Sequence, residues 1–276
     1  MTMSGAQYTR TYTYDNLNRL LTVNSSHYTY ADNAHLHAAT NTSASASYSY
    51  DASGDMTCRA PNSATVCGGS SPTGAQLGYD IQGQLASWQN APSSPTTTAK
   101  YLYDGEGQRV EQQVTASGTT TTTLYLSNLE EVAITGSTTT NAAYFYANGQ
   151  RIALAVNGAI SYLGSDGLGS ATTTLDSSGN GQASELYMPY GGGRWSSGTM
   201  PTRRLYTGQV SDAASGLDYY NARSYDPTLG QFVSADTEPS QLNRYAYVGG
   251  NPTSRTDPDG HGFGRCVRCW RARPSG

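Results

Sequence analysis

Tyr79-Asp80-Ile81-Gln82-Gly83-Gln84-Leu85-Ala86-Ser87-Trp88 is the stretch of the sequence that decides the fold. Tyrosine favours a pleated strand, and an aspartate carboxylate readily accepts hydrogen bonds from backbone N–H groups two residues further along. Glycine then supplies the positive φ with which a tight turn ends, and a short run with apolar members follows. The stretch therefore predicts a β-hairpin.

The same Tyr-Asp-x-x-(Gly or Asn) unit occurs three more times, at Tyr14–Asn18, Tyr50–Gly54 and Tyr103–Gly107. Asn18 takes the place of glycine in the first unit, and asparagine is one of the few residues that tolerate a left-handed backbone. Self-similarity of this kind is typical of repeat architectures. We therefore expect a series of related hairpins along the chain.

A further strand signal lies near the middle of the chain. Asn148-Gly149 and Asn157-Gly158 each separate two apolar runs, and Asn-Gly in that setting is the strongest short cue for a hairpin. These two turns predict a three-stranded meander over residues 144–163.

The composition also favours strands over helices. The 276 residues include 22 Tyr but only three Phe and three Trp, with 31 Gly and 13% charged residues. About 25% charged residues is ordinary for a globular protein. No segment has a convincing helical period, so we expect an all-β fold. Three Ser/Thr/Pro/Gly-rich segments, 61–73, 91–98 and the threonine run 119–123, predict exposed loops or polar edge strands.

Charge and hydropathy exclude several classes of partner. The net charge of −4 gives the body no basic surface of the kind that binds nucleic acid. No stretch approaches the roughly 20 apolar residues of a membrane-spanning helix. Met1–Arg10 lacks the apolar core of a signal peptide, so we expect the chain to be cytoplasmic as synthesised.

The second half of the chain resembles the RHS repeat-associated core of Rhs/YD-repeat proteins, and the Tyr-Asp units resemble the YD repeats of the same family. The resemblance covers about residues 5–261. The family includes the C component of ABC toxins and the teneurin YD-shell. The elements that carry it stand in a specific order: Leu163–Ser170, Tyr187–Gly191, Tyr206–Gln209, Ser215–Phe232, Asn243–Val248, Asn251-Pro252 and Asp257–Gly260.

This resemblance implies an antiparallel YD-repeat β-strip, or β-shell segment, that is closed by the Rhs core. It divides the chain into a hairpin strip (1–160), a core (161–260) and a short variable tail (261–276). In this interpretation the protein is a structural scaffold of a polymorphic toxin that encapsulates or carries a C-terminal effector in bacterial competition or secreted toxin systems. A carbohydrate- or cell-surface-binding module is the alternative.

Two departures from the family bear on that role. Its shells are far longer than four Tyr-Asp units, and only 16 residues follow Gly260. We therefore expect a piece of a shell whose effector is absent, truncated or supplied separately, or a remnant of recombination or a frameshift. The implied partners are the effector or the rest of a longer Rhs shell, VgrG and type VI or other secretion machinery, or cell-surface glycans. As part of a full-length toxin the chain would be secreted or delivered to cell surfaces.

The family also implies a candidate catalytic pair, Asp236 and Asp257. Its members are similar to aspartyl proteases, in which one of two close carboxylates is protonated and the other ionised. The reaction implied is a single-turnover self-cleavage near Gly260 and His261. This chain departs from the family pattern at three positions, with Ala235 before the first aspartate, Thr237 after it and His261 after the glycine. The alternative is that both aspartates only cap turns.

Other candidate sites have simpler interpretations. Arg223, Asp218 and Asp226 are expected to belong to the shell architecture, with Arg223 binding a carboxylate between strands. Cys266-Val267-Arg268-Cys269 has the spacing of a zinc knuckle, but a closed site needs four ligands, and only His261 is available nearby. His35 and His37 are expected at the surface. No phosphate-binding or dinucleotide-binding motif occurs, so neither a cofactor nor a metal is expected.

Overall fold

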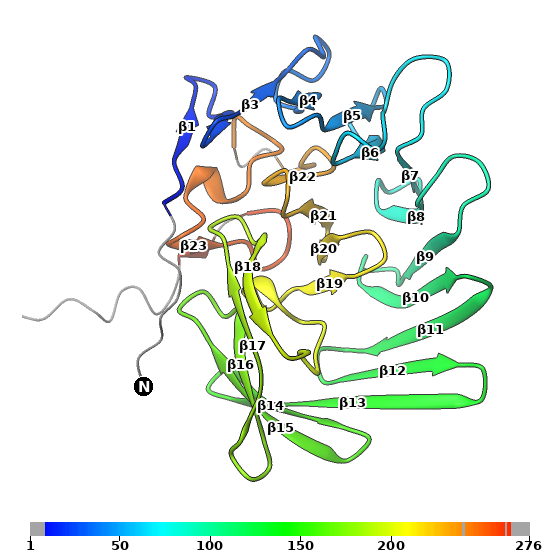
Figure 1. Cartoon of the computed structure of the whole chain (residues 1–276), viewed down its shortest axis with the longest axis vertical. Coiled ribbons are helices and arrows are strands. Elements are labelled where there is room, and N and C mark those ends of the chain that lie inside the picture. Colours follow the sequence, from blue (N-terminus) through cyan, green and yellow to red (C-terminus); the bar gives the residue numbers. More distant parts are fainter. Residues whose placement is uncertain (1–8, 239–240, 263, 266–276) are drawn as a thin grey trace, which may run out of the picture.

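The computed structural model describes residues 9–238, 241–262 and 264–265 (Figure 1). Those residues contain β-strands and two short 3-10 turns, η1 (Tyr206–Gly208) and η2 (Val248–Gly250), but no α-helix. The all-β prediction is confirmed. The described residues therefore contain no helix that is long and apolar enough to cross a membrane.

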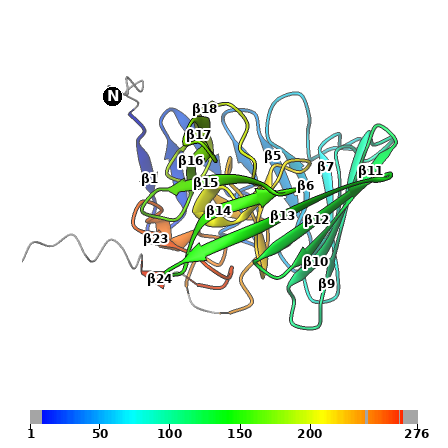
Figure 2. The same ribbon diagram turned by 90° about the horizontal axis from the view of Figure 1, so that it is seen from below.

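Eighteen strands form one continuous antiparallel sheet, the strip, in which each strand pairs with the next along the chain. Figure 1 shows the strip curling from β1 round to β18, and Figure 2 shows the long strands β9 to β13 fanning out, as a twisted sheet does. Its strands are β1 (Tyr12–Tyr14), β2 (Leu20–Val23), β3 (Ser26–Thr29), β4 (Asn41–Thr42), β5 (Ser47–Tyr50), β6 (Met56–Ala60), β7 (Ala75–Tyr79), β8 (Leu85–Gln89), β9 (Thr97–Tyr103), β10 (Arg109–Ala116), β11 (Thr119–Leu126), β12 (Glu130–Thr135), β13 (Thr138–Ala147), β14 (Gln150–Val156), β15 (Ala159–Ser165), β16 (Ala171–Asp176), β17 (Gly181–Tyr187) and β18 (Gly193–Ser197).

A smaller sheet lies within the curve of the strip (Figure 1). This inner sheet consists of β19 (Val210–Asp212), β20 (Leu217–Tyr220), β21 (Arg223–Asp226) and β22 (Gln231–Phe232), and all residues of β20 and β21 are buried. β23 (Arg255–Thr256) pairs with β24 (Gly264–Arg265). The strip's pairing runs on through residue 160, and the division of the chain into 1–160, 161–260 and 261–276 stays a prediction.

The Tyr-Asp units form the hairpin turns that their sequence predicts. In the unit used above, Asp80 Oδ1 accepts hydrogen bonds from the backbone N–H groups of Gln82 and Gln84, both at 2.9 Å, and Gly83 has a φ of 79°. The other three units repeat this pattern. Two turns without the tyrosine, led by Asp166 and Asp176, do the same. The aspartate, together with a Gly or Asn of positive φ, therefore determines this turn, and the tyrosine is not required for it.

Three of the four tyrosines connect their turn to an earlier part of the strip, whereas Tyr14 bonds to Tyr190. The Tyr79 hydroxyl donates to the carbonyl of Met56, the first residue of β6, and the Tyr103 hydroxyl donates to the carbonyl of Leu85, the first residue of β8. Each ring is thereby packed against the sheet while its polar tip is satisfied. The meander predicted for residues 144–163 is also confirmed, as β13, β14 and β15.

Buried ion pairs join the strip to the segment that it encloses. Arg59 of β6 binds Asp226 of β21 through two nitrogens, at 2.6 and 3.0 Å, and Arg109 of β10 binds Asp212 of β19 at 2.6 Å. A third pair places Arg204, next to the inner sheet, 2.8 Å from Glu131 of β12. Burial opposes ionisation of Asp226, but Arg59 outweighs it and lowers the pKa of that carboxyl.

Aromatic side chains fill the space around these pairs. Tyr206, Tyr220, Tyr225, Phe232 and Tyr247 form one buried cluster, in which the rings of Tyr225 and Tyr247 lie 4.8 Å apart. The guanidinium of Arg109 lies over the faces of three tyrosine rings at 4.1 to 5.3 Å. Such contacts favour a buried cation. The core is therefore both aromatic and polar.

Two features differ from the sequence analysis. The threonine run 119–123 lies in β11, which pairs with a strand on each side, so its interpretation as a loop or edge strand is wrong. Threonine is β-branched, and its hydroxyls bond across the strands, as in Thr121–Thr135 at 2.6 Å. In addition, Cys58 and Cys67 form a disulfide that the sequence analysis did not predict.

Replacing Arg59 by methionine should destabilise the fold by about 3–5 kcal/mol, because it leaves Asp226 buried without its cation. The free energy of unfolding is measured by urea denaturation, with Lys100→Met on the exposed side of β9 as the control. The double variant Arg59→Met, Asp226→Leu should be more stable than Arg59→Met alone. A change in Arg59→Met no larger than that of the control would contradict this role.

Asp218 should make the protein less stable as the pH rises. Burial raises its pKa to about 7, and Asp212 and Asp226 nearby act in the same direction. The folded state therefore favours the neutral carboxyl, and stability falls between the unfolded pKa of about 4 and the folded value, by about 1.4 kcal/mol per pKa unit. Asp218→Asn should flatten the pH profile of thermal stability over this range, and the exposed Glu106→Gln should not. Parallel profiles for parent and Asp218→Asn would refute the assignment.

Candidate functional site

The Asp257–Gly260 turn is fixed at its two ends, where Asp257 and Gly260 are buried, whereas Pro258 and Asp259 between them are exposed. Asp257 Oδ1 accepts the N–H of Gly260 at 2.8 Å and that of Gly262 at 3.4 Å. Gly260 has a φ of 83°, and a Cβ atom there would lie 2.3 Å from the carbonyl oxygen of Tyr220. Only glycine fits so close to a neighbouring backbone. The turn therefore lies directly against β20 and the start of β21.

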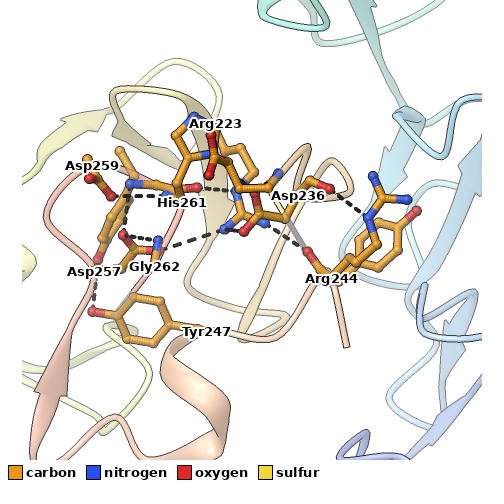
Figure 3. Close-up of polar contacts among 12 residues, drawn as sticks. Arg223, Asp236, Arg244, Tyr247, Asp257, Asp259, His261 and Gly262 are labelled. Atoms are coloured by element: carbon orange, nitrogen blue, oxygen red, sulfur yellow. Dashed lines mark hydrogen bonds and ion pairs between the residues drawn. The ribbon is translucent and has the colours of Figure 1, made fainter. Parts of the chain in front are cut away.

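Arg223 of β21 lies at the centre of the site (Figure 3). One terminal nitrogen of its guanidinium is 3.1 Å from Asp236 Oδ2 and 3.7 Å from Asp257 Oδ2. Its Nε donates to the carbonyl of Gly260, and its other terminal nitrogen donates to the carbonyl of Arg244 at 2.8 Å. One buried cation thus contacts both aspartates and the turn.

Asp236 lies in the loop that follows β22. Its N–H donates to the carbonyl of Arg244 at 3.0 Å, and the Arg244 Nε donates back to the Asp236 carbonyl at 2.6 Å. Oδ1 accepts the N–H of Glu238 at 2.9 Å and lies 3.1 Å from Nδ1 of His261. The Asp236 side chain is therefore fixed by the backbone as well as by Arg223.

Burial dominates the electrostatics of the site. It raises the pKa of Asp257 to about 6, in spite of the N–H groups and Arg223, and it lowers the pKa of Arg223 to about 10. Asp257 and Asp236 are 1% and 2% exposed. Near neutral pH the site therefore combines a carboxyl that protonates readily, a second carboxyl and a cation. Groups of this kind can act as general acid and general base on a peptide bond.

The four residues expected at the site, Asp236, Asp257, Gly260 and His261, do lie together (Figure 3). Both aspartates also accept N–H groups of their own turns, as the turn-capping alternative requires. That alternative and self-cleavage are compatible with one geometry, and the catalytic assignment stays a prediction.

The sequence analysis missed the central position of Arg223 and the contribution of Arg244. It expected Arg223 to bind a carboxylate, and the structure gives it two. Asp226 lies elsewhere, with Arg59. The position of Arg223 and Arg244 at the site could have been inferred from the family motifs, because Arg223 lies in Ser215–Phe232 and Arg244 lies in Asn243–Val248.

The remaining candidate ligands that the structure describes form no site. Cys266 and Cys269 lie outside the described residues. His35 contacts Asp32 at 2.9 Å, and no group of three His, Cys, Asp or Glu side chains that could hold a metal occurs within the part of the chain that the structure describes.

Two cavities flank the candidate site. One of about 930 Å³ is lined by Arg223, Ala235 and His261 on one side and by the turns at Asp80 and Asp104 of the strip on the other. The second, of about 800 Å³, reaches Pro258 and is lined by residues of the strip including Arg151. Arg223 and His261 are therefore reachable from the space between the strip and the inner sheet, whereas neither Asp236 nor Asp257 lines these two cavities.

Comparison with known proteins places this architecture in a family. The family profile described as Teneurin YD-shell matches residues 1–253, which is most of the chain. The chain belongs to the Teneurin YD-shell family. Its resemblance to Rhs/YD-repeat proteins is thereby confirmed, and it is a YD-shell scaffold.

Curated relatives share parts of this YD-shell sequence. Toxin subunit YenC2 of Yersinia entomophaga is 41% identical over 83 residues, 28% of this chain and 8% of that protein. The tRNA3(Ser)-specific nuclease WapA of Bacillus spizizenii is 33% identical over 129 residues, 43% of this chain and 6% of that protein. Salivary gland surface protein 1 of Aedes aegypti is 40% identical over 77 residues, 27% of this chain and 2% of that protein. The chain thus spans only a small part of these relatives.

Solved structures share the YD-shell fold. The TcdB2-TccC3 crystal structure aligns over 91% of this chain and 16% of that one, with a TM-score of 0.61 and 22% identity. The Tc holotoxin pore of Photorhabdus luminescens aligns over 91% and 15%, with a TM-score of 0.62 and 22% identity. At this level of identity the likeness concerns the fold alone.

Substitution of Gly260 by alanine should disturb the site, whereas Gly262→Ala should not. The Cβ of the first variant meets the Tyr220 carbonyl, while that of the second meets nothing within 4 Å. We expect Gly260→Ala to cost about 1–3 kcal/mol through backbone strain and displacement. Thermal unfolding and amide hydrogen exchange at residues 220–223 report the two effects. Equal stability of both variants would show that the turn does not depend on this close approach.

Proposed function

We propose that this YD-shell segment is a wall of a β-shell that carries a C-terminal effector and, within a longer shell, encloses it. The observation that carries the proposal is the position of the 257–262 turn within the curve of the strip, where Asp257 and Gly260 are buried. A polypeptide that continues from this turn begins on the concave side of the wall.

The lining of the concave side supports this role. The cavities beside the site are lined by arginine, tyrosine, aspartate and glutamine side chains together with turn backbone. Such a mixed polar lining binds an apolar surface weakly, so it suits a cargo that must later leave. The names of relatives, a toxin subunit and a tRNA nuclease, indicate the kind of effector that such a wall accompanies. VgrG, type VI or other secretion machinery and cell-surface glycans stay predictions from the resemblance.

A protease-protection experiment tests the carrying role. A flexible 30-residue reporter with one protease site is appended after residue 276, and the same reporter is appended before residue 1 as the matched control. We expect the C-terminal site to be cut about tenfold more slowly, since local exposure controls such cleavage. Equal rates at both ends would contradict enclosure by this segment.

We propose self-cleavage as a second function of the same chain. The specific observation in its favour is that Asp236 and Asp257 both contact Arg223, which also holds the Gly260 carbonyl. Asp257 would act as the acid, because its raised pKa keeps a proton available at mildly acidic pH. Asp236 would accept the proton of the attacking water. The turnover is single and the substrate is this chain.

Intact mass spectrometry of the parent protein and of Asp257→Asn tests self-cleavage. The parent should lose a C-terminal segment that begins near residue 261, and faster as the pH falls towards about 6, where Asp257 takes up its proton. Asp257→Asn should stay intact. Asp176→Asn, which changes an exposed turn of the same type, should be processed like the parent. Processing of Asp257→Asn at the parental rate would reject the assignment.

A further inference from the structure

We propose that the disulfide between Cys58 and Cys67 is a redox-sensitive lock on the wall. It closes where small-molecule disulfides can oxidise the two thiols. Cellular thiols open it by reduction, which frees the loop of residues 61–73 and loosens β6, the strand that carries Arg59. The inference goes beyond the carrying role proposed above, because it concerns the stability of the wall whether or not an effector is attached.

The disulfide lies on the convex face of the strip. Successive side chains of a strand point to opposite faces of the sheet. Arg59 points inward, to Asp226 of the inner sheet, so its neighbour Cys58 points outward. The connection from β6 to β7 also extends away from the inner sheet (Figure 1), and most of residues 61–73 are exposed. The bond is therefore on the side of the wall that faces the surrounding solution.

The backbone at Gly74, just before β7, leaves room for the two bonded sulfur atoms. A Cβ atom at this position would lie 2.7 Å from Cys58 Sγ and 2.8 Å from Cys67 Sγ. Such distances are far inside van der Waals contact, so only glycine lets the backbone approach the sulfurs this closely. The chain around the two cysteines is therefore shaped to hold the bond.

Reduction must move Cys67 rather than Cys58. Once the bond is broken, the two sulfur atoms separate to van der Waals distance, which for non-bonded heavy atoms is roughly 3.5–4 Å. Cys58 is held in β6, which pairs with β5 on one side and β7 on the other. The backbone of Cys67 is held by two serine hydroxyls of β5: its N–H donates to Ser47 Oγ at 2.9 Å, and Ser49 Oγ donates to its carbonyl at 2.7 Å. Because neutral hydrogen bonds contribute little net free energy, the loop yields before the strand does.

The lock is coupled to a charge pair that joins the strip to the inner sheet. Arg59 follows Cys58 in β6, binds Asp226 through two nitrogens and donates to the Ser215 carbonyl at 3.0 Å. The Cβ position of Gly74, which packs against the sulfurs, also lies 3.0 Å from the Arg59 carbonyl oxygen. Movement here therefore changes the backbone that orients the guanidinium. Bidentate pairs depend on geometry, so reduction weakens this one.

The redox step is a thiol–disulfide exchange. A thiolate of the reductant attacks one cysteine sulfur, which forms a mixed disulfide and releases the other cysteine as a thiolate that takes up a proton. A second reductant thiolate attacks the reductant's sulfur in the mixed disulfide and releases the remaining cysteine, which is protonated in turn. Two electrons pass to the chain, and the reductant leaves as its own disulfide.

The same exchange runs in reverse when a small-molecule disulfide is the oxidant. Disulfides persist in oxidising compartments, whereas the thiols of the cytoplasm keep cysteines reduced. The wall is therefore looser in a reducing compartment than in an oxidising one.

Urea unfolding of the full-length chain tests the lock in two glutathione buffers, one at the cytoplasmic potential and one oxidising. Alkylation and peptide mass spectrometry report the state of Cys58 and Cys67. We expect free thiols in the first buffer and the bond in the second. Reduction should raise the equilibrium constant of unfolding about 100-fold, as for a cross-link between residues nine apart. A bond that survives the first buffer, free thiols in the second or equal stability in both would overturn the inference.

Two double variants are the controls. Cys58→Ser with Cys67→Ser should have the stability of the reduced parent in both buffers. Cys266→Ser with Cys269→Ser should respond like the parent, because it keeps the lock and removes the other two cysteines of the chain. A response of the first variant to the buffer would assign the effect to other groups and overturn the inference.

A thermodynamic cycle tests the coupling to Arg59. Arg59→Lys should raise the equilibrium constant of unfolding by a smaller factor in the reduced protein than in the oxidised protein, because reduction has already weakened the pair with Asp226. Lys100→Met, on the exposed side of β9, should have the same effect in both states. Equal factors for Arg59→Lys in the two states would overturn the coupling.

Discussion

A sheet that curls must cover its concave face, and in this chain buried charge pairs fix the cover in place. Arg59 and Arg109 reach inward from the strip to Asp226 and Asp212 of the inner sheet, and Arg204 reaches outward to Glu131. A guanidinium with a matched carboxylate tolerates only a narrow range of geometries. These pairs therefore set the register between the inner sheet and the strip, and with it the position of β21, from which Arg223 extends towards the 257–260 turn.

The tyrosine-rich composition follows from the same arrangement. A core that contains ionised groups needs neighbours that are bulky and also able to hydrogen-bond. Tyrosine supplies both, and around Arg109 it adds ring faces that attract the cation. A core of leucine and phenylalanine would bury the same area but would leave these charges without polar contacts.

The parts of the fold that could be predicted are those set by local contacts. Asp80 bonds residues two and four positions along the chain, so its turn can be read directly from the sequence, and Asn148-Gly149 is equally local. Arg59 and Asp226 are 167 residues apart, and nothing near either residue identifies the other. The prediction for the threonine run was wrong because threonine-rich segments are common in loops, whereas the branched Cβ atoms of threonine suit a strand. At the candidate site, the aspartates came from the resemblance to the family, but the convergence of Arg223 and Arg244 on them depends on long-range packing.

The strip's turns have a consequence for how such a wall can change in length. Each strand of the strip pairs only with the strands next to it in sequence, and the Tyr79 and Tyr103 hydroxyls bond to the preceding hairpin. Gain or loss of a whole hairpin therefore changes strand pairing only locally, as in a solenoid, but it also shifts the later strands relative to the enclosed segment. The spacing of Arg59, Arg109 and Glu131 must match partners that are fixed in that segment, and strands on either side of this stretch contact it as well, as in Tyr28–Leu229 and Tyr144–Thr202. A wall of this kind can therefore change in length without disturbing the enclosed segment only beyond the strands that contact it.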